Sequence, residues 1–135
     1  MESIFTKIIN GKIPCYKVIE NDNFLAILDT RPISKGHTLC IPKIEVDYIF
    51  DLDDDLLQRL ILFSKKVAKG IRKVVQCPKI GVAVEGFEVQ HAHVHLFPIY
   101  PGQGVNISRQ RMNLPESEMA KLAEEIGKEV KLILN

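Results

Sequence analysis

Three histidines stand at alternate positions in residues 91–95, which read His-Ala-His-Val-His. In a β-strand successive side chains point to opposite faces, so this spacing places the imidazoles of His91, His93 and His95 on the same face. The alanine and valine between them, and Leu96 after them, then point to the other face and into a core. The run therefore predicts a strand over residues 89–99 that is apolar on one side and carries imidazoles on the other.

Histidine is the side chain whose ordinary pKa lies close to neutral pH, and it suits nucleophilic and acid–base chemistry. A neutral imidazole attacks phosphorus readily, and neighbouring imidazoles can bind the non-bridging phosphate oxygens. Clustered histidines also disfavour one another's protonation, which keeps a nucleophile neutral. We therefore favour phosphate chemistry at this strand. Two alternatives stay open: polar side chains on a solvated sheet face, and a zinc site completed by His37, Asp29 or Glu88.

Composition indicates an ordinary globular protein with a substantial core. The chain has 135 residues, of which 46% are hydrophobic and 26% charged, so we expect one domain over residues 1–135. A net charge of +1 argues against bulk attraction to nucleic acid or to a membrane. No signal peptide or apolar run of about 20 residues is visible. The three scattered cysteines form no paired motif, which favours a reducing, cytoplasmic location.

Hydrophobic periodicity predicts an α+β fold. A helix is expected over residues 3–10, a long amphipathic helix from residue 53, and a C-terminal helix with Pro115 as its first residue. Strands are expected at residues 16–20, 24–28, 37–41, 80–84 and 89–99. The acidic residues 53–55 suit the start of a helix, with a metal site as the alternative. The result is a five-stranded, mainly antiparallel sheet covered by the long helix.

The histidine run resembles a known family motif. Residues 91–97 fit the pattern His-φ-His-φ-His-φ-φ of the histidine triad (HIT) family, in which φ is apolar. Residues 4–9 followed by Gly-Lys-Ile-Pro at 11–14 resemble the opening helix and turn of that family. Residues 24–29 and 36–43 resemble its Phe-Leu-Ala and Gly-His segments, so the resemblance covers most of the chain.

The resemblance implies a HIT-like fold and cleavage of nucleotides at the α-phosphate through a covalent nucleotidyl-histidine. By position His93 is the expected nucleophile, and the main-chain carbonyl of His91 is expected to keep one nitrogen of its ring protonated. His95 and His37 are expected to contact the α-phosphate or to assist departure of the leaving group.

Further positions are implied for substrate binding. Asp29 is expected to accept hydrogen bonds from ribose hydroxyls. The expected walls of the base pocket are apolar: Phe5, Ile8, Ile27 and Leu28. For the first two of these residues, simple packing of a helix on the sheet explains the pattern equally well.

The chain also departs from the family pattern. Residues 84–88, Val-Glu-Gly-Phe-Glu, lack the Asn, Gln and Ser/Thr found there in many members, and Glu88 replaces the hydroxyl residue. A carboxylate beside a phosphate would repel an anionic substrate unless it is paired or turned away. Some members hold a structural zinc, but Ser3, Thr6 and Glu45 stand at ligand positions here, so we expect no metal and no cofactor.

These observations predict a hydrolase or transferase that acts on purine nucleotide conjugates. Nucleoside phosphoramidates are the first expected substrates and dinucleoside polyphosphates the second. We expect no nucleic-acid or membrane partner, and the resemblance implies a homodimer. The alternative is a nucleotide-binding regulatory protein with the same fold and little or no turnover, which the altered residues 85–88 favour.

Overall fold

The computed structural model describes residues 2–134. Every expected element is present, and all ends except one lie within a single residue of the prediction. In chain order the elements are α1 (Ile4–Ile9), β1 (Lys17–Glu20), β2 (Phe24–Leu28), β3 (Thr38–Pro42), the short 3-10 helix η1 (Ile49–Asp51), α2 (Asp54–Val74), β4 (Lys79–Ala83), β5 (Val94–Ile99) and α3 (Glu116–Leu134).

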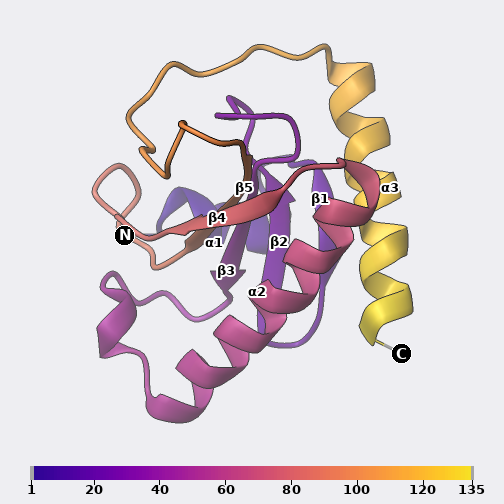
Figure 1. Cartoon of the computed structure of the whole chain (residues 1–135). Coiled ribbons are helices and arrows are strands. Elements are labelled where there is room, and N and C mark those ends of the chain that lie inside the picture. The colour runs from indigo at the N-terminus through magenta and orange to yellow at the C-terminus, as the bar shows by residue number, and fades with distance from the viewer. Residues whose placement is uncertain (1, 135) are drawn as a thin grey trace.

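The strands form one five-stranded sheet in the order β1-β2-β3-β5-β4 (Figure 1). Every neighbouring pair is antiparallel, which confirms the predicted α+β class. Strands β1 and β4 are the two edges. Strand β5 pairs with β3 on one side and with β4 on the other, so the histidine run enters the middle of the sheet.

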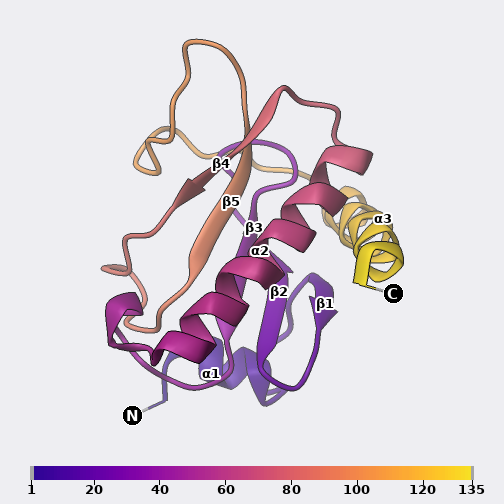
Figure 2. The ribbon, with the colours of Figure 1, turned by 60° about the horizontal axis from the view of Figure 1, so that its bottom comes forward.

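The two sheet faces are covered differently, as Figures 1 and 2 show. Helices α2 and α3 pack on one face, and the short helix α1 lies behind the sheet on the other. The main core fills the helix-covered face and includes Ala92, Val94 and Leu96, as their alternation predicts. A smaller apolar cluster lies under α1 and contains Phe5, Leu25, Ile27, Leu39 and Ile41. The histidine face of β5 is therefore the face on which α1 lies.

Local sequence accounts for the helix ends. The Asp53 carboxylate accepts a 2.8 Å hydrogen bond from the Leu56 N–H, which makes Asp53 the N-cap of α2 and gives its carboxylate a structural role. At α3 the helix begins at Glu116, one residue after the prediction, and the Pro115 carbonyl accepts from the Met119 N–H. Gly127 of α3 lies against the Val18 carbonyl of β1, where a Cβ would clash.

The histidine strand is shorter than predicted. It begins at Val94 rather than at residue 89, so His95 alone of the three histidines lies within the ladder. Continued by two residues, the register with β3 would pair Ala92 with Pro42, the last residue of β3. Proline has no N–H to donate, and the Pro42 carbonyl accepts instead from the His91 ring. The Ala92 N–H bonds to the Val46 carbonyl outside the sheet.

Two further expectations concern the surroundings of the protein. Among residues 2–134 no helix is both long and apolar enough to cross a membrane. Cys15, Cys40 and Cys77 are free thiols. The cytoplasmic location remains a prediction.

Candidate functional site

A cavity of about 430 Å³ opens on the sheet face that carries α1. This volume falls in the usual range for small-molecule sites, about 300–1,000 Å³. Apolar side chains from α1 and β2 line one part of it, and polar groups at the ends of β2 and β5 line the other. The predicted site residues among them are Phe5, Ile8, Ile27, Leu28, Asp29, Glu88, His93 and His95.

His93 faces this cavity with a defined tautomer. Its Nδ1 lies 2.7 Å from the main-chain oxygen of His91, and because a carbonyl only accepts, Nδ1 carries the proton. In a neutral ring the lone pair is then on Nε2. No buried side-chain nitrogen or oxygen in the described part of the chain lacks a hydrogen-bond partner, so the unpartnered Nε2 is accessible to solvent. Phe5 of α1 packs edge-on against the ring at a centroid distance of 4.9 Å.

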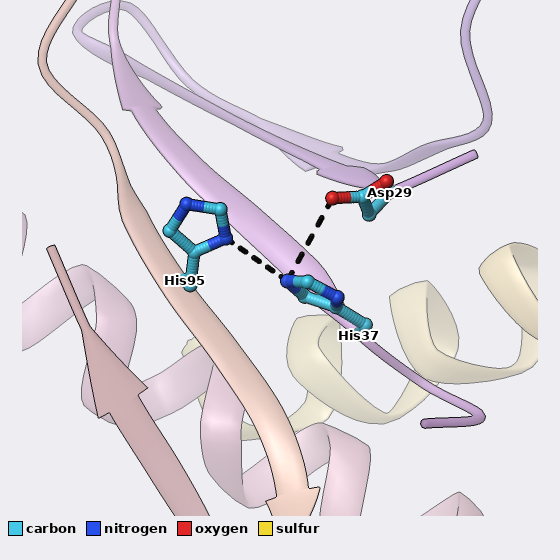
Figure 3. A group of neighbouring side chains, drawn as sticks. All are labelled: Asp29, His37 and His95. Carbon is cyan, nitrogen blue, oxygen red and sulfur yellow. Dashed lines mark hydrogen bonds and ion pairs between the residues drawn. The ribbon is translucent and has the colours of Figure 1, made fainter. Parts of the chain in front are cut away.

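His37, the residue before β3, and His95 of β5 form a hydrogen-bonded pair (Figure 3). The Ile33 N–H donates to Nδ1 of His37 at 3.1 Å, so the proton of the neutral ring is on Nε2. This Nε2–H donates to Nδ1 of His95 at 3.0 Å. Neutral His95 must therefore carry its own proton on Nε2. The cavity thus receives a lone pair from His93 and an N–H donor from His95.

Burial keeps these rings neutral. It lowers the pKa of His37 to about 3, and the positive charges of Arg111 and Arg109 act in the same direction. Burial is also the largest cause that lowers the pKa of His95 to about 3, with its two histidine neighbours adding to it. The pKa of His93 is lowered by burial as well, against the opposing effect of its hydrogen bond to His91. A neutral imidazole therefore faces the cavity at physiological pH.

Asp29 directly follows β2 and lines the cavity, and part of its hydrogen-bond accepting capacity is free. Its Oδ1 accepts from the Arg31 N–H at 2.9 Å, and its Oδ2 accepts from Arg111 at 3.1 Å. A carboxylate has about four acceptor positions, so others are left for a ligand's hydroxyl groups.

Arg111 was missed by sequence analysis. Its guanidinium also donates to the carbonyls of Arg31 and Ile107, so it ties the loop of residues 105–112 to the end of β2. It is the only lysine or arginine among the described residues that line the cavity. The available signal was charge: Arg109 and Arg111 are the sole charged residues between Pro101 and Pro115.

One expectation needs correction. His37 is 1% exposed and does not line the cavity. Its side chain therefore does not contact a phosphate in the cavity directly and acts on the cavity through its hydrogen bond to His95. His91 is fully buried and lies outside the cavity lining, and its carbonyl lies 2.7 Å from Nδ1 of His93, the contact that was expected of it. Leu28 belongs to the main core and also lines the cavity, as expected for a wall residue.

The altered segment before the histidines borders the cavity. Glu85 and Glu88 both line it, together with Phe87, which is 85% exposed. Glu88 is exposed, and neither carboxylate forms a salt bridge within residues 2–134. Two negative charges therefore stand beside the histidines without a cationic partner.

The zinc alternative does not fit the donor set. Ligand atoms of Asp29, His37 and His95 lie within 4.8 Å of one another. A metal on Nε2 of neutral His37 would require a proton on Nδ1, but Nδ1 faces the N–H of Ile33. The N–H of Ile33 and the Nδ1–H of His37 would then point at each other. In addition, the Asp29 carboxylate is already paired with the Arg111 guanidinium. This trio is arranged for hydrogen bonding rather than for a divalent cation.

Comparison with known proteins identifies the family. The family model for the HIT domain matches residues 10–102. The adenosine 5'-monophosphoramidase of Schizosaccharomyces pombe is 35% identical over 137 residues, covering 97% of this chain and 100% of its own. An uncharacterized HIT-like protein of Borreliella burgdorferi is 32% identical, covering 93% of this chain and 96% of its own.

Solved structures agree with this result. A histidine triad nucleotide-binding protein from Sulfolobus tokodaii superposes with a TM-score of 0.83 at 29% identity, covering 96% of this chain and 92% of its own. A Hit-like protein from Bartonella henselae gives 0.81 at 30% identity, covering 95% and 96%. By sequence and by fold, this chain belongs to the HIT domain family, the histidine triad nucleotide-binding proteins.

Proposed function

We propose that the protein is a hydrolase or nucleotidyl transferase that cleaves purine nucleotide conjugates at the α-phosphate through a covalent intermediate on His93. Nucleoside phosphoramidates are the first substrate class and dinucleoside polyphosphates the second. The observation that carries the proposal is the pairing of tautomers at the cavity: a free lone pair on Nε2 of His93 beside the Nε2–H of His95. The similarity to a monophosphoramidase supports the choice of substrate.

The chemistry proceeds in two displacements. In the first, Nε2 of His93 forms a bond to the α-phosphorus, the bond from phosphorus to the leaving group breaks, and the leaving group takes up a proton from solvent. The Nε2–H of His95 donates to a phosphate oxygen and stabilises the charge that develops there. In the second, the oxygen of water bonds to phosphorus and releases a proton to solvent, the bond from phosphorus to Nε2 of His93 breaks, and the nucleoside monophosphate leaves.

The cavity supplies a place for the nucleoside. Asp29 offers its remaining acceptor positions to the two ribose hydroxyls. The apolar side chains of Phe5, Ile8 and Ile27 form the walls against which a planar base packs. The phosphate then lies between these walls and the two histidines.

A regulatory nucleotide-binding protein is the second candidate, and the position of Glu85 and Glu88 favours it. Two unpaired carboxylates at the cavity oppose binding of a second anionic group and slow attack on a charged phosphate. Such a protein would bind nucleotide without forming an adduct.

Intact-mass spectrometry after rapid mixing with adenosine 5′-phosphoramidate separates the two candidates. The enzyme predicts a transient mass gain of one AMP in the native protein and none in His93→Ala. Nucleotide binding without an adduct and without AMP release would overturn the enzymatic proposal and leave the regulatory one.

We further propose that a second copy of this chain is the partner. Edge strand β4 presents exposed Val82 with an unpaired ladder edge, which natural proteins usually cover. Antiparallel pairing of β4 with itself about Val82 would set Lys79 of one copy opposite Glu85 of the other. Further exposed apolar side chains adjoin this edge, on α2, at and just before η1, and in the loop after β4: Tyr48, Phe50, Ile61, Val84 and Phe87.

A further inference from the structure

His91 differs from the other two histidines of the run because it does not reach the cavity. Its side chain is fully buried, and both of its ring nitrogens are hydrogen-bonded to the protein. Nε2 lies 2.8 Å from the Pro42 carbonyl, which can only accept, so Nε2 carries the proton of the neutral ring. Nδ1 is then an acceptor, and the Ser3 hydroxyl, 2.8 Å away, donates to it.

The donor on Ser3 is itself held by a small polar network. The Ser3 Oγ accepts from the Thr6 N–H at 3.0 Å, and its own proton has two acceptors in reach, Nδ1 of His91 at 2.8 Å and the Thr6 hydroxyl at 3.2 Å, of which His91 is the nearer. The Thr6 hydroxyl donates to Oε1 of Glu45 at 2.6 Å, and the Ser3 N–H donates to the same oxygen at 2.6 Å. These hydrogen bonds lower the pKa of Glu45 to about 2, with the Thr6 hydroxyl as the largest cause. Glu45 is therefore a fixed anion that orients both groups.

The nucleophile needs support of this kind. His93 lies before the first residue of β5, so no ladder hydrogen bond of the sheet positions it. Its ring is oriented by the main-chain carbonyl of His91 and by the edge of Phe5, which belongs to the same helix as Thr6. An error in the placement of His91 would therefore move the reactive nitrogen directly.

We propose that Ser3, Thr6 and Glu45 are positioning residues that fix the tautomer and orientation of His91 and, through its carbonyl, the position of the His93 nucleophile. These three residues are here termed the positioning network. It joins α1 and the segment after β3 to the histidine run, three parts of the chain that are distant in sequence. The effect on catalysis rests on the proposed function, whereas the effect on the His91 ring does not.

The first test removes the donor and measures both effects. In Ser3→Ala we expect kcat for adenosine 5′-phosphoramidate to fall about tenfold with little change in KM, because small misplacements of reacting groups are costly. Long-range ¹H–¹⁵N spectra should show His91 as the Nε2–H tautomer in the native protein and as a mixture in the variant. Ser3→Thr keeps the hydroxyl and should restore both readouts.

Controls separate positioning from stability. Ser3 also caps α1, so Glu45→Gln provides a variant that leaves the cap in place; we expect a smaller fall in kcat in the same direction. Ser117→Ala makes the same chemical change at an exposed position of α3 and should change neither kcat nor the His91 spectrum. Thermal unfolding checks that all variants are folded at the assay temperature.

The outcomes distinguish this inference from the proposed function. Absence of turnover in the native protein, with a His91 tautomer that depends on Ser3, would overturn the enzyme and retain the network. Native turnover with an unchanged kcat and an unchanged His91 spectrum in Ser3→Ala would overturn the network alone. A fall in kcat that Ser3→Thr fails to restore would also contradict it.

Discussion

His37 donates its Nε2–H to Nδ1 of His95 at 3.0 Å, and this bond decides which nitrogen of His95 presents a proton to the cavity. The two residues are 58 positions apart, in the loop before β3 and at the second residue of β5. The Ile33 N–H donates to Nδ1 of His37 and so places the proton of that ring on Nε2. A main-chain group therefore sets the direction of the hydrogen bond from His37 to His95.

We therefore predict that His37→Phe lowers kcat for adenosine 5′-phosphoramidate about tenfold or more, while the protein still binds AMP. Phenylalanine fills the same buried space but cannot donate to His95, whose proton is then free to move to Nδ1. Loss of one preorganised donor of this type commonly costs about 100-fold or more in rate. Steady-state kinetics and calorimetric titration with AMP measure the two effects. Equal kcat in variant and native protein would remove His37 from the mechanism.

The same pair makes stability depend on pH. The pKa of both rings is lowered to about 3 in the folded protein by burial, whereas the unfolded chain takes up protons near 6.5. Between these values the unfolded state binds more protons, so stability is full above about pH 6.5 and is lost as pH falls toward 3. Thermal unfolding between pH 7.5 and 4 should show a falling midpoint, with a shallower slope in His37→Phe. Parallel slopes for the two proteins would contradict this account.

Much of this architecture is readable from the sequence because short-range pattern determines it. Both ends of β2 are predicted correctly. The start of α2 is predicted from its acidic N-cap, and the helix itself from its long apolar stripe. The sheet faces follow from alternation, so the placement of Val94 in the core and of His95 on the opposite face is also predictable. The roles of these residues in catalysis remain predictions.

The start of β5 could not be predicted, because it depends on a partner distant in the chain. Pro42 ends the ladder opposite Ala92, and Gly86, with φ of +84°, turns the chain away from the other neighbouring strand. Arg111 was missed for a related reason: it acts on Asp29 across 82 residues from a segment without regular structure. Neither contact leaves a periodic signal in the sequence.

Arg111 should govern binding more than chemistry. Arg111→Ala removes the bonds to Asp29 and to the carbonyls of Arg31 and Ile107, so we expect KM for nucleotide substrates to rise about tenfold because Asp29 and the loop lose their fixed positions. Hydrogen exchange should quicken across residues 105–112. The matched control is Arg109→Ala, since no side-chain hydrogen bond or salt bridge of Arg109 is seen within the described chain. An equal effect of both substitutions would indicate general charge rather than this contact.

The proposed homodimer predicts that Val82→Arg produces a monomer. A charged side chain at the centre of paired β4 edges meets its own copy across the twofold axis, where like charges repel. Light scattering after size-exclusion chromatography measures the mass of native and variant protein. Leu132→Arg introduces the same charge at an exposed position of α3 and should leave the mass unchanged. A native protein that is already monomeric would contradict the proposed partner.

Substitution of Glu88 is expected to strengthen substrate binding, in contrast to substitution of Arg111, which is expected to weaken it. It lines the cavity, and it and Asp29 are the carboxylates whose charges act to raise the pKa of His93. Two unit charges about 6 Å apart at an effective dielectric of about 20 interact by about 3 kcal/mol before salt screening, and an exposed site keeps only a fraction of this. We therefore expect Glu88→Gln to lower KM for diadenosine tetraphosphate about threefold to tenfold, and to lower it less for the singly charged phosphoramidate. Glu124→Gln on α3 removes the same charge far from the cavity and should change neither KM. If Glu88→Gln leaves both values unchanged, this carboxylate turns away from the bound phosphates and does not set substrate choice.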